Sequence, residues 1–359
     1  MYQPFNNISI KVFGSSHADR LGLELEGIPA GEKIDLEKLQ AFVDRRKSGK
    51  NAWSTPRIEP DEVVVDSGIV NGATNGKCIV ASIVNTNRRS SDYSPYKDTP
   101  RPSHADYTAI IKDGDKVDLA GGGRFSGRMT SMLCIAGGIA KQILEKRDIF
   151  VGAYVSNIGG VQGASYETKN ISMEDIEKAY GNSPCAISKC KEMTKVVLDA
   201  RKVGDSVGGQ VECIVYNAPK GLGDNLFGGI EGRVSTALFG IPACKAVESG
   251  IGTKLAGMKG TKANDPFEIK NGVIRTKSNN DGGINGGISN GMPITFRATF
   301  KPTPSISAEQ KTVNLKTMRN TTIQINGRHD ACIVPRAVPV VEAVVALAVL
   351  DLMIESEKI

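Results

Sequence analysis

Residues 337–354 read A-V-P-V-V-E-A-V-V-A-L-A-V-L-D-L-M-I and form the most apolar stretch of this 359-residue chain. A membrane-spanning helix needs about 20 predominantly apolar residues with few or no charges. This stretch contains Pro339, Glu342 and Asp351, so it predicts a helix buried in the core of a globular protein. The first residues lack a basic region followed by an apolar run, and we therefore expect no secretory signal, no membrane partner and a cytoplasmic location.

The composition around this helix is that of an ordinary globular protein, with 40% apolar and 23% charged residues. The formal net charge of +6 is modest. It suits an anionic small substrate or a nucleic acid, and charge alone does not decide between them. Seven cysteines are scattered without a C-x-x-C spacing, which is typical of small buried residues in a reducing cytosol and indicates no structural zinc site.

Apolar periodicity predicts several elements in the first part of the chain. Strands are expected over 8–13, 62–67 and 78–85, where β-branched residues are frequent. Asp35 can cap a helix whose apolar face is made by Leu36, Leu39, Phe42 and Val43. The cations Arg45-Arg46-Lys47 follow this helix, and on pattern alone we interpret them as favourable charges at the negative end of the helix dipole.

Further along, a long polar loop is expected over 86–107, and Gly121–Gly123 lead into an apolar helix over 129–144. Ser172 and Asp175 form a capping pattern for another helix, and Ser183-Pro184 are expected to open a further one. Residues 211–216 read as a strand. Because strands and helices do not alternate regularly and no linker divides the chain, we expect one mixed domain over 1–359.

The three histidines of the chain all occupy polar loops: His17 in GSSHADR, His104 in RPSHADY and His329 in GRHDA. A single histidine is more often structural than catalytic, but none of these lies on an apolar helical face. Ser16 and Ser103 precede two of them and could orient a ring or join a proton relay. No two histidines are three or four residues apart, so we expect no metal site.

Many arginines lie in the same kinds of loop, next to Gly, Ser, Pro or His. Any one of them is best explained as a solvated surface residue, yet as a group they indicate a site for an anion with several negative groups. The segment G-G-G-R-F-S-G-R at 121–128 precedes a helix, where backbone N–H groups favour phosphate, although a simple tight turn explains it equally well. The group comprises Arg45, Arg46, Arg57, Arg88, Arg89, Arg101, Arg124, Arg128, Arg328 and Arg336.

The last third of the chain adds a proline-bounded polar loop with Lys301 and Ser305, and Asp330 beside His329. Asp330 is a candidate base or only a helix N-cap. Taken from the residues alone, the chain is interpreted as an enzyme that acts on a small polyanionic substrate by acid–base chemistry.

These blocks together resemble the chorismate synthase family. GSSHA is similar to the family pattern GESHG, and RPSHADY is similar to RPGHADY. RSSDY, GGGRFSGR, GGINGGISNG, FKPTPSI and GRHDACIVPRAVPVVEA match further family blocks in order and spacing. The similarity runs almost from end to end, so chance is a poor explanation.

The resemblance implies an α+β fold, a β-α-β sandwich with helices between two antiparallel sheets, assembled as a homotetramer. It implies a carbon–oxygen lyase that converts 5-enolpyruvylshikimate 3-phosphate to chorismate by 1,4-anti elimination of phosphate, the last step of the shikimate pathway to aromatic amino acids. The family requires reduced FMN although the reaction is redox-neutral. Neither end of the chain looks like an added reductase domain, so we expect the monofunctional bacterial type, with NADPH at most an indirect reductant.

The resemblance also implies roles for particular residues. His17 would protonate the departing phosphate, with Ser16 beside it. His104 would protonate the flavin or hold its protonation state, Asp330 would act with flavin N5 on the proton at C6, and Ser126 matches a catalytic serine. Cofactor contacts are implied for Arg124, Phe125, Ser126, Pro242, Ala243, Gly286, Lys301, Pro302, Thr303, Pro304, Ser305 and Arg328. Substrate or NADP contacts are implied for Arg46 and Lys50.

Several positions depart from the family pattern. Ser15 and Ala18 replace Glu and Gly around His17, Ser103 replaces a Gly before His104, and Ala52 stands where many members have an arginine. These departures motivate one alternative, a paralogue that binds FMN with weak or no elimination activity. A second alternative is a nucleic acid-binding protein that uses the Arg/Gly loops, against which the 5% aromatic content and the dispersed arginines count.

Overall fold

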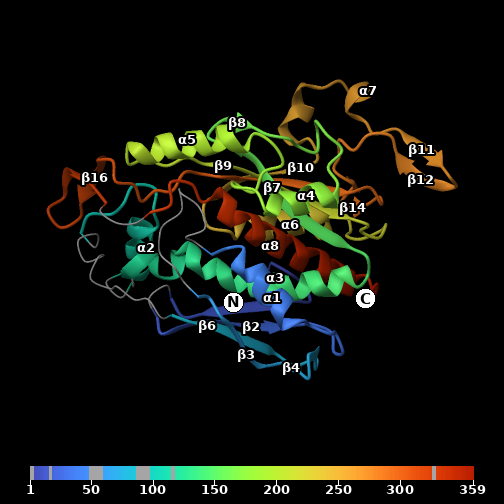
Figure 1. The fold of residues 1–359 in the computed structure, drawn as a ribbon, viewed down its shortest axis with the longest axis horizontal. Helices are drawn as coiled ribbons and strands as arrows, with labels where there is room; N and C mark the ends of the chain where they lie inside the picture. The colour runs from blue at the N-terminus through green and yellow to red at the C-terminus, as the bar shows by residue number, and fades with distance from the viewer. Residues whose placement is uncertain are drawn as a thin grey trace.

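The computed structural model describes residues 4–15, 18–47, 60–85, 98–114, 117, 119–325 and 329–359, and it arranges them as a three-layer sandwich (Figure 1). Two β-sheets flank a central layer that contains the helices α3 and α8. This arrangement confirms the expected α+β sandwich with helices between two antiparallel sheets.

The first sheet has four antiparallel strands in the order β1-β2-β6-β3. Apolar side chains of its two central strands, among them Leu21, Leu23 and Ile83, are fully buried. The strands predicted over 8–13, 62–67 and 78–85 are confirmed. The strands are β1 (Ser9–Phe13), β2 (Arg20–Glu26), β3 (Val63–Ser67) and β6 (Ile79–Val84), and β4 (Ile69–Val70) pairs with β5 (Ala73–Thr74) in a short hairpin.

The second sheet has five strands in the order β10-β15-β9-β7-β8, and every pair is antiparallel. Seven of the nine residues of β7 are buried, so this strand is covered on both faces. The strand predicted over 211–216 lies within β9. The strands are β7 (Phe150–Ile158), β8 (Val161–Gln162), β9 (Gly209–Tyr216), β10 (Cys244–Ser249) and β15 (Ile294–Phe300).

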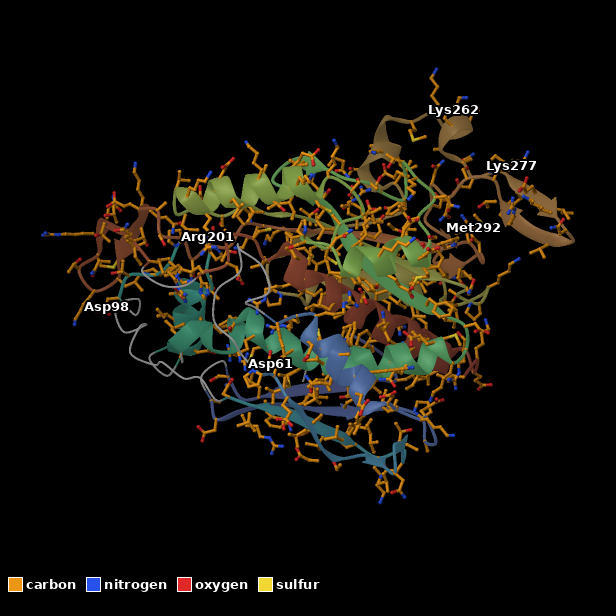
Figure 2. All side chains as sticks on the ribbon, viewed as in Figure 1. Asp61, Asp98, Arg201, Lys262, Lys277 and Met292 are labelled. Carbon is orange, nitrogen blue, oxygen red and sulfur yellow. The ribbon has the colours of Figure 1, made fainter. Side chains whose placement is uncertain are left out.

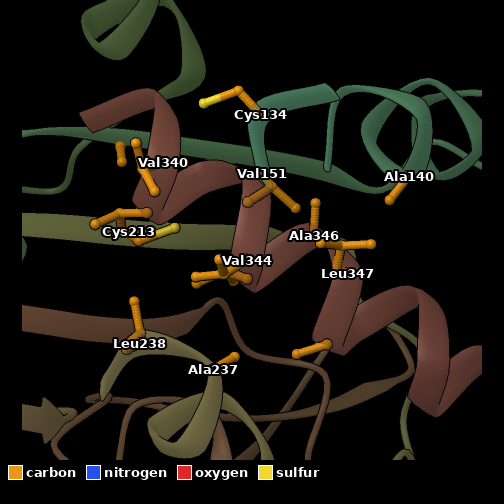
Figure 3. Close-up of a cluster of buried hydrophobic side chains, with 14 of the residues drawn as sticks. Cys134, Ala140, Val151, Cys213, Ala237, Leu238, Val340, Val344, Ala346 and Leu347 are labelled. Atoms are coloured by element: carbon orange, nitrogen blue, oxygen red, sulfur yellow. The ribbon is translucent and has the colours of Figure 1, made fainter. Parts of the chain in front are cut away.

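The helical layer is built around α8 (Val334–Glu355), the helix predicted from the opening stretch of apolar residues. Among the described residues, α8 is the one helix long and apolar enough to cross a membrane, and 94% of its apolar window is buried inside the protein. It packs against α3 (Thr130–Glu145), α6 (Ile230–Phe239), β7 and β9, whereas α1 (Leu36–Asp44) packs on α3. Figure 3 shows side chains from these elements in one core, among them Cys134, Ala140, Val151, Cys213, Ala237, Leu238, Val340, Val344 and Leu347.

Two of the three acidic residues of α8, Glu342 and Asp351, are fully buried, and each is paired with at least one cation. Glu342 accepts hydrogen bonds from Arg45 Nη2 at 2.6 Å and from Lys141 Nζ at 2.8 Å. Asp351 forms an ion pair with Arg233 and accepts from the backbone N–H groups of Asn7 and Ile8 at 2.7 and 2.9 Å. These pairs connect the core helix to α1, α3, α6 and the start of β1.

The remaining elements surround this sandwich. Ser172 and Asp175 form the predicted capping box of α4. The segment with α7, β11 and β12 projects from the body, and Figure 2 labels Lys262 and Lys277 on it. The elements are α2 (Asp106–Asp113), α4 (Met173–Tyr180), α5 (Cys190–Lys202), α7 (Gly260–Ala263), β11 (Phe267–Lys270), β12 (Val273–Thr276), β13 (Ile284–Asn285), β14 (Ile288–Ser289), β16 (Gln310–Asn314) and β17 (Arg319–Ile323).

Three local predictions were wrong. Ser183-Pro184 lie in a turn, and α5 begins only at Cys190, because Cys185 and Lys189 have φ of 66° and 61° and interrupt a right-handed helix. The polar loop ends before Asp106, where α2 begins. The side chains of Arg45 and Arg46 extend to Glu342 and Thr130 in the core, so their main role is not at the end of α1.

Candidate functional site

A cavity of about 770 Å³ lies where five segments meet: 101–105, 124–130, 239–245, 301–305 and 329–340. This volume is within the range of small-molecule sites, roughly 300–1,000 Å³. The amino ends of α3 and α8 both reach the cavity, through Thr130 and through Ile333, which caps α8. The positive ends of two helix dipoles therefore point toward this region and favour a negatively charged ligand.

The lining is strongly cationic. Asp330 is the one acidic residue among the described residues of the lining. The cavity is accordingly suited to a ligand with several negative groups. The cationic residues of the lining are Arg46, Arg101, Arg124, Arg128, Lys245, Lys301 and Arg336.

Arg46 is the most deeply buried of these cations, with 3% of its surface exposed. Its Nε donates to Thr130 Oγ1 at 2.8 Å and its Nη2 to the Gly127 carbonyl at 2.5 Å. Burial, with the nearby charges of Arg336 and Arg128, lowers the pKa of Arg46 to about 10. Asp61, whose Oδ2 lies 3.8 Å from Arg46 Nη1, balances part of this positive charge.

Arg128 is anchored by Asp61, whose carboxylate lies 2.9 Å from Arg128 Nη2, and by Asn85 Oδ1, which accepts from Nε at 2.9 Å. Neither Asp61 nor Asn85 is among the residues lining the cavity. Asp61 and Asn85 therefore fix the guanidinium of Arg128 from outside the cavity lining.

His104 lies in the loop before α2, and its ring is held by a buried pair. Its Nδ1 is 2.6 Å from Asp106 Oδ1, and Arg101 binds the same carboxylate through Nε and Nη2, both at 2.7 Å. Asp106 is fully buried and Arg101 is 5% exposed. Ser103, immediately before His104, has a φ of 58°, the left-handed region that favours glycine.

Arg124 and Phe125 end a short 3₁₀ helix, Ala120–Phe125, and Ser126 separates it from a second one, Gly127–Met129. Ser126 caps the second of these, and its Oγ accepts from the backbone N–H of Arg128 at 3.3 Å. Arg124 lies over the ring of Phe125, 4.9 Å from its centroid, and donates to Asp113 Oδ2 at 2.5 Å. The predicted glycine-rich turn before a helix is confirmed, and it places Phe125 and Ser126 on the cavity wall.

The loop 301–305 forms another wall and is tied to the His104 loop at both ends. Lys301 Nζ donates to the Ser103 carbonyl at 2.5 Å, and Arg101 Nη1 donates to Ser305 Oγ at 3.3 Å. Burial and the charge of Lys245 lower the pKa of Lys301. Lys301 N also donates to the carbonyl of Ala243, a residue with a φ of 70°.

Asp330 and His329 complete the site at the start of α8. Arg336 Nη1 donates to Asp330 Oδ2 at 2.5 Å, and Arg336 Nε donates to the carbonyl of Arg46. The cap of α8 is Ile333, so Asp330 is not its N-cap. His329 Nε2 is a buried atom without a hydrogen-bond partner among the described residues, and burial, together with Arg101, lowers the pKa of this histidine.

The cavity brings together most of the residues singled out in the sequence. Gly286, in the turn between β13 and β14, and Pro302 are not among the lining residues. Ser16, His17, Lys50 and Arg328 lie outside the described residues. The singled-out residues that do line the cavity are Arg46, Arg101, Ser103, His104, Arg124, Phe125, Ser126, Arg128, Pro242, Ala243, Lys301, Thr303, Pro304, Ser305, His329, Asp330 and Arg336.

The structure also adds residues that sequence reasoning missed. Asp106 holds His104 from the first turn of α2, and Lys245 lies in the lining next to the predicted Pro242–Ala243. The spacing His-Ala-Asp could have indicated Asp106, because a carboxylate two residues after a histidine is close enough in the chain to contact the imidazole ring. No comparable sequence pattern indicated Lys245, which lies in β10.

The comparisons with known proteins agree with this geometry. The model of the family described as chorismate synthase matches residues 8–354. Proteins named chorismate synthase from Dehalococcoides mccartyi and Thermococcus gammatolerans are 46% and 44% identical, over 97% and 96% of this chain and 95% of each relative. A crystal structure of chorismate synthase superimposes with a TM-score of 0.76 at 26% identity, covering 98% of this chain and 93% of the other. The chain therefore belongs to the chorismate synthase family and is a lyase.

Proposed function

We propose that this protein eliminates phosphate from 5-enolpyruvylshikimate 3-phosphate in a 1,4-anti sense to give chorismate, using reduced FMN without net redox change. The reaction would be the last step of the shikimate pathway and would take place in the cytoplasm. One observation carries the proposal: seven cationic side chains and the amino ends of two helices converge on a single cavity that has one acidic residue in its described lining.

The residues of the cavity fit a flavin mononucleotide. An apolar wall that includes Phe125, Ile241 and Pro242 suits a ring system, and the cations suit its phosphate. Thr303 Oγ1 and His329 Nε2 are buried without hydrogen-bond partners among the described residues, as expected of atoms that bond to a ligand. Residues 301–305, Arg124 to Ser126 and Pro242–Ala243 would hold the cofactor, with Arg328 as a further candidate outside the described residues.

In this proposal the side chains neutralise the charge of the departing phosphate and transfer protons. Phosphate leaves as an anion, so an acid and several arginines must balance its charge. His17, outside the described residues, is proposed as that acid, and Arg46 and Arg336 are proposed as cations that balance the charge of the phosphate. Reduced FMN, when bound, supplies electron density that no side chain can provide.

Two further residues have proposed proton-handling roles. Asp330, oriented by Arg336, is the candidate to accept the proton lost from C6 of the substrate. His104, whose ring lines the cavity, is the candidate to exchange a proton with the flavin. Reduced flavin would be supplied by another protein, with NADPH as the indirect source of electrons.

The test is anaerobic turnover of 5-enolpyruvylshikimate 3-phosphate with photoreduced FMN, in which chorismate and phosphate are measured together. We expect equal amounts of both products from the parent protein. His17→Ala, His104→Ala and Asp330→Asn should each lower kcat by about 100-fold or more, the usual size of a general acid–base contribution. Asp199→Asn, on an exposed face of α5, is the matched control and should leave kcat unchanged.

A parent protein that binds FMN but releases neither product would contradict the proposal. That outcome would favour a paralogue in which Ser15, Ala18 or Ala52 has changed the site. Loss of activity in Asp199→Asn as well would mean that the assay reports folding and not catalysis.

We also propose that the protein assembles as a homotetramer. Large apolar side chains are exposed on the surface, for example Leu226 at 86% and Phe227 at 98% before α6, and Ile269 at 77% on the projecting strand β11. Exposed apolar groups of this kind often mark protein–protein contacts. Light scattering coupled to gel filtration should give four times the mass of one chain, 38.2 kDa, and a monomeric mass would contradict the proposal.

A further inference from the structure

Two charged side chains, Asp106 and Arg101, approach the Nδ1 edge of His104. Asp106 Oδ1 lies 2.6 Å from Nδ1, and Arg101 Nη2 lies 3.1 Å from the same nitrogen. Arg101 Nη2 is in turn 2.7 Å from Asp106 Oδ1. An arginine can only donate, and a carboxylate without a proton can only accept. The two neighbours therefore demand opposite states of Nδ1.

The shorter distance decides between these states. If Nδ1 carried no hydrogen, its lone pair would face a carboxylate oxygen at 2.6 Å, and two acceptors would repel each other without a proton between them. If Nδ1 carries the hydrogen, it donates to Oδ1 at a distance typical of a charge-assisted hydrogen bond. Arg101 then uses Nη2 for Asp106 and only approaches Nδ1.

The surroundings of Asp106 keep its side chain ionised as a carboxylate. Burial alone would raise the pKa of its carboxyl group, but hydrogen bonds from Arg101 and His104 outweigh burial and hold this pKa well below its usual range. The residue also starts α2, where the positive end of the helix dipole favours an anion. Its second oxygen, Oδ2, accepts from Arg101 N at 3.1 Å and from Arg101 Nε at 2.7 Å.

We propose that Asp106, clamped by Arg101, is a positioning residue that fixes neutral His104 as the Nδ1–H tautomer and leaves Nε2 as the proton-accepting nitrogen on the cavity wall. The opposite edge of the ring, with Nε2 and Cε1, lies next to Gly122. A Cβ built on Gly122 would lie 3.6 Å from Nε2 and 3.6 Å from Cε1, so this edge passes over a glycine beside the cavity. Only a small residue leaves that edge open to a ligand.

The clamp also connects His104 to the proposed cofactor loop. Arg101 Nη1 donates to Ser305 Oγ at 3.3 Å, so the guanidinium that grips Asp106 also touches a residue that lines the cavity. The position of the imidazole is thereby tied to the loop 301–305. The catalytic meaning of this inference rests on the proposed function, whereas the tautomer does not.

The first test uses the unmodified protein. The chain has three histidines, so selective ¹⁵N-histidine labelling gives a spectrum simple enough to assign with His104→Gln. At a pH where the ring is neutral, we expect the Nδ1 of His104 to show the shift of a protonated nitrogen and Nε2 that of a bare one. A neutral His104 with its hydrogen on Nε2 would overturn the proposal, whatever the protein catalyses.

The second test removes the charge of the clamp. In Asp106→Asn the amide can present either its oxygen or its N–H₂ to the ring, so the preference for Nδ1–H should be lost in the ¹⁵N spectrum. We expect kcat to fall by about 100-fold or more with KM changed by less than about 3-fold, because the ring would present the wrong nitrogen. Asp175→Asn, which makes the same change in the first turn of α4, is the control and should alter neither the spectrum nor kcat.

The outcomes separate the two proposals. An inactive parent protein with the expected Nδ1–H tautomer would overturn the proposed function and leave the clamp intact. An active parent in which Asp106→Asn keeps both the tautomer and kcat would overturn the clamp and leave the proposed function intact. If Asp106→Asn does not fold, the spectrum of the parent still decides.

Discussion

Ser103 shows at the scale of single residues how a departure from the family pattern is accommodated. It stands where the family pattern has glycine, and its φ of 58° lies in the left-handed region. A side chain there costs about 1–2 kcal/mol. The hydrogen bond from Lys301 Nζ to the Ser103 carbonyl holds the loop in this conformation, so the strained residue is retained next to His104.

Substitutions at Ser103 test this strain. Ser103→Gly removes it but adds about 0.5–1 kcal/mol of chain entropy to the unfolded state, so we expect the free energy of unfolding to stay within about 1 kcal/mol of the parent. Ser103→Val places a β-branched side chain in the left-handed region and should lose about 2 kcal/mol. Equilibrium urea denaturation measures both, and a valine variant as stable as the parent would show that the loop is not strained.

His329 provides a prediction about pH. Burial and the nearby Arg101 lower its pKa below the value of about 6.5 expected in the unfolded chain. The unfolded chain therefore binds more protons at mildly acidic pH, and the stability contributed by neutral His329 is lost as pH falls through 6.5 toward the folded pKa. Between pH 7.5 and 5.5 we expect the parent to lose more unfolding free energy than His329→Gln in urea titrations. Equal losses in both proteins would contradict this.

At the scale of elements, the crossing of α3 and α8 determines how the helical layer packs. A Cβ on Gly137 of α3 would lie 2.3 Å from both Cα and Cβ of Ala343 in α8, so the two helices meet backbone to backbone. The neighbouring Gly138 faces α1 instead, where its Cβ would lie 2.6 Å from the end of the Leu39 side chain. Gly137 therefore faces a rigid backbone, whereas Gly138 faces a side chain that can move.

Alanine substitutions distinguish these two glycines. Alanine favours a helix interior over glycine by about 1 kcal/mol, but in Gly137→Ala the overpacking against Ala343 should exceed that gain, with a net loss of about 2 kcal/mol or more. In Gly138→Ala the Leu39 side chain can rotate away, so the loss should be smaller. Thermal or urea unfolding of the pair checks this, and equal stability of the two variants would contradict the close crossing.

At the scale of the whole molecule, Glu342 joins the helical layer to the second sheet. Its carboxylate binds Arg45 after α1, Lys141 of α3 and the backbone N–H of Ala153 in β7, the last at 3.3 Å. Burial would raise the pKa of Glu342, but Arg45 and Lys141 outweigh it and lower the pKa to about 2. Glu342 therefore links α1, α3 and α8 of the helical layer to β7 of the second sheet.

Glu342→Gln should be among the most destabilising polar substitutions in the protein. It leaves two cations without their counter-charge in the core, for which we expect a loss of about 3–5 kcal/mol. Since the folded pKa lies below the unfolded one, the contribution of Glu342 is present above about pH 4.5 and declines as pH falls toward 2. Glu355→Gln, whose carboxylate is 41% exposed, is the control and should lose less than about 1 kcal/mol. A similar effect of both variants in urea denaturation would contradict the central role of Glu342.

Much of the fold was predictable because it follows from local patterns. The strands β1, β3, β6 and β9, the helices α1, α3 and α8, and the capping box of α4 were predicted from apolar periodicity and capping residues that act within a few positions of one another. The start of α5 was mispredicted because Ser-Pro is common both at a helix start and in a turn, and the left-handed residues that follow carry no distinctive letters.

The sequence predicted the chemical character of the candidate site but not its geometry. Loops with His, Arg and Gly, read with the family resemblance, indicated His104, Ser126, Lys301 and Asp330, and all four line one cavity. Sequence by itself thus determined the elements, the buried core helix and the chemical character of the site. Only the tertiary structure decided that Arg45 and Arg46 turn into the core, that Gly286 lies away from the cavity and that Asp106 clamps His104. Those outcomes depend on distances of a few ångströms between segments as much as 297 residues apart, which the packing of helices and sheets sets and no local pattern encodes.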